Sequence, residues 1–231
     1  MPTFNTVVPI HNVDLPQSTS VDFGGGLRLS ATPAWVRNQK LLKRASAQDQ
    51  EAVEHASHAF IVSYEAAALG APDPGWTGVG PKSIQESKYE LCVLGNLALW
   101  LTKPSPVCFT LVIHAPQVED EPVAQQIQTH GPMLLCHPRD IGARITASDL
   151  GVAQRLHRGL VAVEPTSAVF TAIRATWAGL QMNIAAIRYA LFWIALEALF
   201  GPEDAREITY RLSQRLALFL AADRREAKDL F

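Results

Sequence analysis

An apolar run at residues 183–200, NIAAIRYALFWIALEALF, restricts more than any other feature what this chain can fold into. As a helix, the run is nearly long enough to cross a bilayer. Arg188 and Glu197 lie inside it, however, and a charged side chain at that depth in lipid is costly. The sequence therefore predicts a fully buried helix inside a bundle, and no insertion into a membrane.

The apolar run belongs to a longer stretch with helical spacing. Ser148 is predicted to cap a first helix, and Thr166 to open a second. The run itself is the third helix, and the acidic pair at 203–204 favours the start of a fourth. A further helix is expected before the end of the chain. The second part of the protein, residues 146–231, is therefore predicted to be a helical bundle.

Residues 1–145 mix the two kinds of pattern. Strands are predicted where β-branched and aromatic residues alternate or cluster: a hairpin around Gly24-Gly25-Gly26, then 58–66, 107–115 and a short strand at 133–137. Helices are predicted after capping residues, at 34–45, at 47–58 after Ser46, and from the Ser83/Glu86 capping box to about Leu101. The fold class expected for the whole chain is α+β and helix-rich.

The composition is that of a globular protein, with 48% hydrophobic and 18% charged residues. A net charge of −2 provides no overall cationic field to attract nucleic acid. Cys92, Cys108 and Cys136 form an odd, sparse set without a CxxC pair, which favours reduced thiols. Because the first residues also lack the features of a signal peptide, we expect a cytoplasmic protein.

Two weaker patterns in the sequence have simpler interpretations. Several His and Cys side chains could in principle bind zinc, but their spacings match no standard site: His55, His58, His114, His130, Cys136 and His137. The glycines of 75–81 precede a capped helix, as in an anion-binding loop, but the Walker ending is absent and a flexible loop is favoured. The sequence therefore predicts no metal and no cofactor.

Three linked segments carry a resemblance to a known family: RYALFWIALEALFG at 188–201, EITYRLSQRLALFLA at 207–221 and RREAKDLF at 224–231. They resemble the Apea-like branch of the HEPN superfamily, in which an apolar helix with an ALE-L core precedes an E-x-x-Y-R-L-x-x-R-x-A helix. The residues that occupy those places are Ala195-Leu196-Glu197, Glu207, Tyr210-Arg211-Leu212, Arg215 and Ala217. The close match covers about 45 residues of this chain, and it implies a HEPN-type bundle over 146–231.

The polar residues of this match can also be interpreted without the family. Glu197 is the only acid in a long apolar stretch, so it is expected to be buried and to need a partner. Arg211 and Arg215 lie one turn apart on the next predicted helix, and Glu207 is spaced to pair with Arg211. Together with Tyr210, these residues are predicted to form a structural polar network that sets the angle between two helices, without a catalytic role.

The resemblance also indicates what the chain lacks. HEPN ribonucleases are metal-independent and use an R-x4–6-H motif in a later helix, at a dimer interface. The last histidine of this chain is His157, so the helical part contains no such motif. No catalytic residue is therefore predicted, and the bundle is expected to be incomplete at its C-terminus. The leading hypothesis is a HEPN-like bacterial defence or stress-response protein that acts as a binding or dimerisation module.

Two alternatives remain open. The first is a ribonuclease, a toxin or abortive-infection effector, whose catalytic helix lies beyond Phe231. The second is a nucleotide or small-ligand sensor whose N-terminal region holds the ligand. Arg155, His157 and Arg158 form a small cationic cluster that could contact RNA, although a solvated face is the default interpretation. A homodimer through the C-terminal helices is expected from the family and from the apolarity of 189–200.

Overall fold

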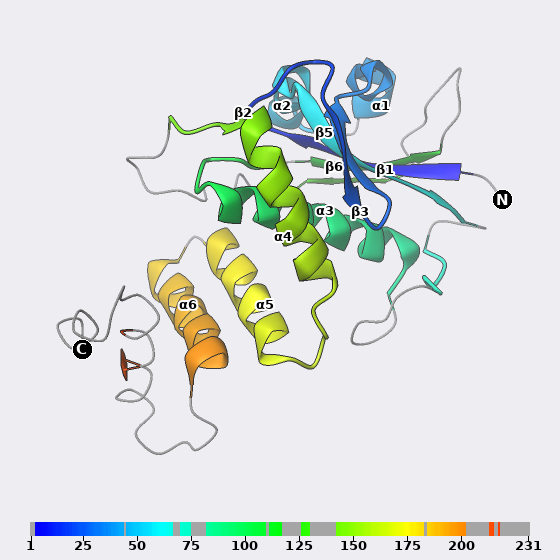
Figure 1. Cartoon of the computed structure of the whole chain (residues 1–231). Helices are drawn as coiled ribbons and strands as arrows, with labels where there is room; N and C mark the ends of the chain where they lie inside the picture. The colour runs from blue at the N-terminus through cyan, green and yellow to red at the C-terminus, as the bar shows by residue number, and fades with distance from the viewer. Residues whose placement is uncertain are drawn as a thin grey trace. The chain divides into compact units, whose positions relative to one another are not determined.

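A computed structural model describes residues 3–43, 45–66, 70–74, 82–109, 111–116, 126–129, 142–182 and 184–201, with Ser213, Gln214 and Ala217. The chain forms two compact units, Met1–Ala162 and Val163–Phe231. The expected α+β class is confirmed: the first unit combines a sheet with helices, and the described elements of the second are helical. Figure 1 shows the elements of both units.

The first unit is built on a six-stranded antiparallel sheet with the strand order β3-β4-β5-β1-β6-β7. Its strands are β1 (Thr3–Ile10), β3 (Ser20–Gly24), β4 (Leu27–Ala31), β5 (His58–Glu65), β6 (Leu111–Pro116) and β7 (Gln126–Thr129). A separate parallel pair joins β2 (Val13–Asp14) to β8 (Ile145–Thr146). The predicted hairpin around the three glycines is the β3–β4 pair, where positive φ angles at all three suit residues without a side chain.

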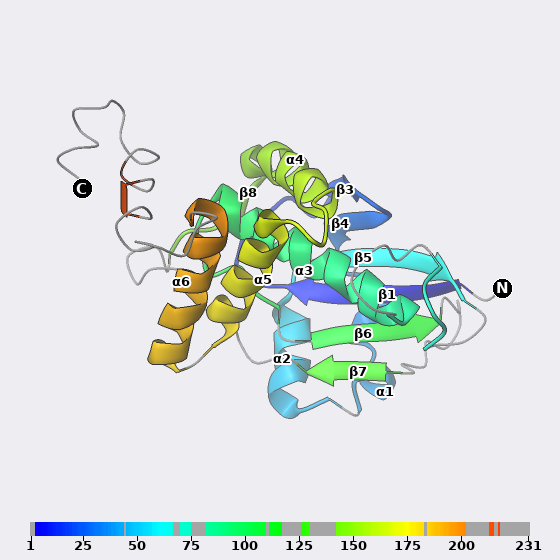
Figure 2. The ribbon, with the colours of Figure 1, turned by 90° about the horizontal axis from the view of Figure 1, so that it is seen from below.

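Helices cover both faces of the sheet. On one face, α3 (Ile84–Thr102) lies so close that a Cβ added to Gly95 would come within 2.9 Å of Leu27 and Phe60. On the other face, Val7 and Ile113 join a cluster with residues of three short elements. These elements are η1 (Ala34–Arg37), α1 (Gln39–Leu42) and α2 (Ala47–His55). Figures 1 and 2 show α3 on one side of the sheet and α1 and α2 on the other.

The alternation of side chains along the strands explains this three-layer arrangement. Successive side chains of a strand point to opposite faces of a sheet, and β1, central in the sheet, is buried at every position after Thr3. Both of its faces therefore need a cover. The longer helix is stabilised at its start by the predicted capping box, in which Ser83 accepts a hydrogen bond from Glu86 N and Glu86 accepts one from Ser83 N.

Helix α4 (Leu150–Val161) was expected to open the bundle, after a boundary near residue 145, but it belongs to the first unit. It packs against α3 and β3, and Gln154 donates a hydrogen bond to Asp22 O at 2.7 Å. The compact units divide after Ala162 instead. Helical spacing identifies an amphipathic helix but not the partner of its apolar face, so the sequence could not assign α4 to the sheet.

In the described part of the second unit, α5 (Ala168–Gln181) and α6 (Ala185–Phe200) form a helical hairpin. Its buried residues are small, namely Ala172, Ala175 and Ala195, and Gly179 lies against the Phe192 ring. Small residues let two helices approach closely. The Arg188 guanidinium donates to Met182 O from both Nε and Nη2, at 2.9 and 2.6 Å, and so satisfies a carbonyl at the end of α5.

Several boundaries differ from the sequence predictions for local reasons. Thr146 and Asp149 form the capping box before α4, preceded by a 3-10 turn η3 (Ala147–Asp149), so Ser148 is not the cap. Ser167, not Thr166, caps α5. The strand predicted from residue 107 begins at 111, and β7 was not predicted. The strand predicted at 133–137 lies outside the described residues, as do the helix start at 203–204 and the loop 75–81.

Candidate functional site

The outward face of α6 carries a stripe of larger side chains: Tyr189, Trp193 and Glu197, spaced four residues apart. The Tyr189 and Trp193 rings are stacked, with centroids 6.4 Å apart and an interplanar angle of 22°. The Trp193 indole N–H donates to Glu197 Oε1 at 2.7 Å. These two contacts link side chains that follow one another turn by turn along the helix, and we call this set the α6 stripe.

The α6 stripe lies opposite the side of the helix that packs on α5. Ala195 is buried in the α5–α6 contact, and Phe192 meets Gly179. At 100° per residue, Trp193 lies about 160° around the helix from Ala195. Tyr189 is 69% exposed, the highest value among the exposed large hydrophobic side chains. An ordered aromatic pair is thus presented away from the hairpin.

The surroundings of the stripe are apolar as well. Large hydrophobic residues of α6 that are exposed are Ile187, Ile194 and Leu199, and Ile184 precedes the helix. Among the described residues of α6, Ala195 is the only one that is buried. The prediction of a fully buried helix at 183–200 is therefore wrong for this chain. Its apolar composition was identified correctly, but α5 covers only one side of it.

Of the predicted structural polar network, Glu197 lies in the described part of the chain, whereas Glu207, Tyr210, Arg211 and Arg215 do not. Glu197 is half-buried rather than buried, and its described partner is the Trp193 indole. A neutral donor of this kind was not predicted, because the sequence pointed to the cationic side chains of Arg211 and Arg215 as partners. The i,i+4 spacing of Trp193 and Glu197 was the pattern that could have found it.

The cationic cluster predicted as a possible RNA contact is divided by the fold. His157 is completely buried, with Nδ1 2.9 Å from Phe23 O and Nε2 3.3 Å from Leu91 O. Burial lowers its pKa, while the two carbonyls act in the opposite direction. Its ring therefore attaches α4 to β3 and α3 and cannot reach a ligand in solvent. Arg155 and Arg158 are exposed and remain as the surface part of the cluster.

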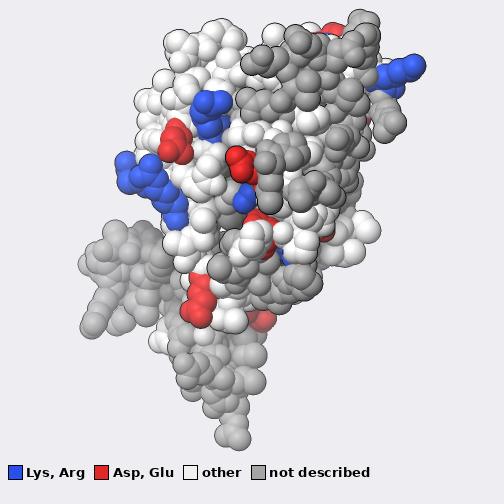
Figure 3. Space-filling view, turned by 90° about the vertical axis from the view of Figure 1, so that its right-hand side faces the viewer, with Lys and Arg blue, Asp and Glu red and all other residues white. Residues whose placement is uncertain are grey.

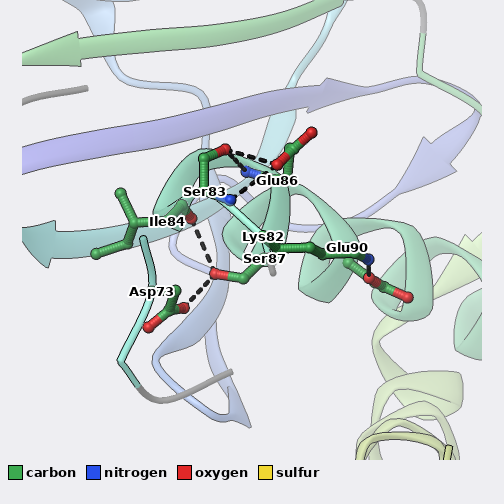
Figure 4. A network of polar contacts seen from close by, with 7 residues as sticks. All are labelled: Asp73, Lys82, Ser83, Ile84, Glu86, Ser87 and Glu90. Atoms are coloured by element: carbon green, nitrogen blue, oxygen red, sulfur yellow. Dashed lines mark hydrogen bonds and ion pairs between the residues drawn. The ribbon is translucent and has the colours of Figure 1, made fainter. Parts of the chain in front are cut away.

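Polar side chains at the start of α3 and just before it form hydrogen bonds and ion pairs with one another (Figure 4). Ser87 donates to Asp73 and to Ile84 O, and Lys82 pairs with Glu90. The Glu86 carboxylate lies at the helix N-terminus, where two hydrogen bonds from Ser83 lower its pKa. Because a carboxylate of the chain already occupies the end of the helix, an anion bound there would meet repulsion.

Charges on the described surface are mixed. On the face shown in Figure 3, cationic and anionic side chains are interspersed, without one continuous cationic area among the described residues. In the same part of the chain, no three His, Cys, Asp or Glu side chains gather to hold a metal ion. None of the helices described is long and apolar enough to cross a membrane.

No protein-family model matches the chain, and neither does any curated protein or any solved structure. The α6 stripe combines a largely exposed Tyr189 with a half-buried Trp193 and a half-buried Glu197. Clustered Tyr and Trp side chains at a protein surface are enriched at the centres of protein interfaces.

Proposed function

We propose that this protein is a binding module that self-associates through the outward face of α6. The observation that carries the proposal is the exposure of Tyr189, stacked on Trp193, within an apolar helix surface. A helix that is apolar all round is normally covered on all sides, and exposed apolar patches mark interaction sites. A second copy of the same chain is the occupant that best fits this surface.

The order of residues along the stripe is self-complementary. In a two-fold dimer, residue i of one copy meets residue j of the other, and the reverse contact is identical. If two α6 helices cross antiparallel with Trp193 at the axis, Tyr189 of each copy lies opposite Glu197 of its partner, since both are four residues from Trp193. The Tyr189 hydroxyl could then donate to the remaining carboxylate oxygen, and the rings would be removed from water.

The family expectation supports the same proposal. The residues at 188–231 that resemble an Apea-like HEPN domain favour a HEPN-like bundle in a bacterial defence or stress-response protein of the cytoplasm. We further propose that this chain carries no nuclease chemistry of its own, because its last histidine, His157, attaches α4 to the sheet. The ribonuclease alternative would need catalytic residues elsewhere.

Self-association can be tested by light scattering coupled to size-exclusion chromatography. Tyr189→Glu introduces a charge on the α6 stripe, and Val161→Glu introduces the same charge on the exposed surface of α4. The two wild-type side chains are 69% and 43% exposed. We expect a dimeric mass for the wild type and the control, and a monomeric mass for Tyr189→Glu. A monomeric wild type at high micromolar concentration would disprove the proposal.

A second candidate function is RNA contact, favoured by the exposure of Arg155 and Arg158 near the β3–β4 turn, where Arg158 Cγ lies 3.5 Å from a Cβ built on Gly24. Replacing both arginines with Gln should weaken RNA binding in a salt-dependent way if this surface is used. Incubation of the wild type with labelled RNA in EDTA addresses catalysis separately. Specific cleavage there would contradict a non-catalytic module.

A further inference from the structure

Side chains of helix α4 bind the backbone of the edge strand β3. This strand is the last in the order β3-β4-β5-β1-β6-β7, and its register with β4 shifts between Asp22 and Gly24. At this irregularity, Gln154 of α4 donates to Asp22 O at 2.7 Å. Nδ1 of His157, also on α4, lies 2.9 Å from Phe23 O. Edge strands carry carbonyl groups that can pair with another chain, and here α4 side chains occupy two of them.

The His157 ring lies between two backbone carbonyls that belong to different elements. Its Nδ1 faces Phe23 O on β3, and its Nε2 lies 3.3 Å from Leu91 O on α3. A neutral imidazole has one N–H group, whereas the charged form has two. Because a carbonyl oxygen only accepts, the neutral ring can bond one of the two carbonyls, and the shorter distance assigns its N–H to Nδ1. Only the charged ring could donate to both.

The surroundings of the ring oppose a positive charge. His157 is completely buried, and the Phe23 ring meets it edge-on with centroids 5.6 Å apart. Burial lowers the pKa of His157, and the two carbonyls only partly offset this effect. Of the charged groups that act on the ring, Arg158 on α4 lowers the pKa and Asp22 on β3 raises it, while α3 contributes the Leu91 carbonyl. The docked ring is therefore neutral near pH 7, and it would gain a proton more easily in water.

The position of α4 allows it to detach without disruption of the sheet. It is the last element of the first unit, which ends at Ala162. Strand β3 pairs with β4 along its length, and this pairing involves no atom of α4. The fully buried side chains of the helix are Leu150, Ala153 and His157, so the histidine forms a large part of the buried attachment. Elements with few buried apolar contacts open locally at a lower cost than the whole domain.

We propose that His157 is an acid-sensitive latch that holds α4 on the edge strand β3. As the pH falls below about 6.5, the ordinary pKa of histidine in water, the released helix binds a proton on His157 and the docked helix does not. The docked state is therefore fully favoured above this pH and loses population below it. Release uncovers two carbonyls of β3, the groups through which an edge strand pairs with other chains. The latch lies in the first unit and is independent of the proposed self-association.

Hydrogen exchange of the full chain, followed by mass spectrometry at pH 7.5 and pH 5.0, measures the release of α4. Exchange times are adjusted for the pH dependence of the intrinsic exchange rate. We expect the opening of α4 to rise by up to about thirtyfold at pH 5.0, because a free imidazole is then mostly protonated. Peptides from β1 and β5, in the middle of the sheet, should keep their protection. Unchanged protection of α4, or an equal loss in β1 and β5, would overturn the proposal.

His157→Asn is the variant that removes the latch. Its amide can donate to Phe23 O in place of Nδ1 but gains no proton in this pH range. We expect α4 of this variant to open to the same extent at both pH values, and a retained pH dependence would contradict the proposal. His114→Phe is the control, since it removes a second buried histidine from the same unit and should leave the pH dependence of α4 unchanged.

A titration of the wild type by nuclear magnetic resonance, with the histidine side-chain nitrogens labelled, does not depend on the folding of a variant. We expect His157 to gain its proton below the pH at which a free histidine does, and together with the loss of α4 protection. Protonation of His157 above about pH 6.5, or without any change in α4, would overturn the latch.

Discussion

The two units of this protein differ in how far they cover their large apolar side chains. In the first, a sheet is covered on both faces, and its large side chains are fully buried, among them Phe23, Phe60 and Phe109. In the second, the described helices α5 and α6 meet through alanines and a glycine, and several large side chains of α6 are exposed, among them Tyr189, Ile194 and Leu199. Both units are rich in apolar residues. Apolar composition alone therefore does not determine whether a side chain is buried within its own unit.

Buried and exposed apolar side chains therefore have different roles in this protein. Side chains buried within the first unit contribute to folding stability through their removal from water. Exposed apolar side chains on α6 contribute little until a partner covers them, and they are therefore available for association. Four measurements can test this difference between buried and exposed side chains, and the first has the largest expected effect.

Truncation of Phe60 should have the largest effect. Its ring is fully buried, makes an edge-to-face contact with Phe23 at 5.4 Å and lies against Gly95. We expect Phe60→Ala to lower the free energy of unfolding by about 3–5 kcal/mol, measured by urea denaturation. A loss below about 1 kcal/mol would show that the sheet interior is not tightly packed.

Acidic pH should lower the folding stability of the first unit because of the buried His114. In the unfolded chain this side chain binds a proton below about pH 6.5, but in the folded protein only near pH 4. The unfolded state therefore holds more protons between these values, and stability is lost as the pH falls from 6.5 towards 4, by up to about 3 kcal/mol.

Urea denaturation at pH 7.5 and at pH 4.5 measures this effect, and His114→Phe should reduce the difference between the two values. The second unit offers an internal comparison, since no histidine follows His157. An unchanged pH dependence in His114→Phe would assign the acid sensitivity to other groups.

Two glycine substitutions compare the packing of the units directly. A Cβ on Gly95 would meet Leu27 and Phe60, both fully buried, at 2.9 Å, so we expect Gly95→Ala to cost about 1–3 kcal/mol. A Cβ on Gly179 would meet Phe192 at 2.7 Å, but this ring is only half-buried and can shift.

Both glycines lie inside helices, so both variants gain up to about 1 kcal/mol in helix propensity. This gain should offset much of the smaller packing cost in Gly179→Ala. Thermal unfolding of the two variants, measured under the same conditions, shows which substitution lowers the stability more. If Gly179→Ala proved the more harmful of the two, the α5–α6 contact would be as rigid as the sheet interior.

Tyr189→Ala should have the smallest effect on the isolated chain, below about 0.5 kcal/mol at protein concentrations where the wild type is monomeric, because this side chain is largely exposed. At higher concentrations, the variant should lose the concentration dependence of the wild-type melting temperature. A loss above about 1 kcal/mol in the monomer would mean that the chain itself covers the α6 stripe.

Local features were predictable wherever neighbouring residues carry the information. The Ser83/Glu86 capping box, the Ser46 cap, the triple-glycine hairpin and the strand at 58–66 all occur as expected. Each depends on contacts within a few residues. The candidate sites could not be predicted from neighbouring residues. The α6 stripe depends on which side of the helix α5 covers, and the contacts of His157 depend on how α4 packs against β3 and α3.

The sequence by itself determined that this chain would combine a mixed α/β part with apolar helices, and where most of those elements begin. Only the tertiary structure decided that α4 joins the sheet, that His157 is an internal attachment rather than a surface cation, and that Tyr189 on α6 stays exposed. The physical reason is that periodicity shows that an apolar face must be covered, whereas the identity of the covering element depends on contacts between residues distant in sequence.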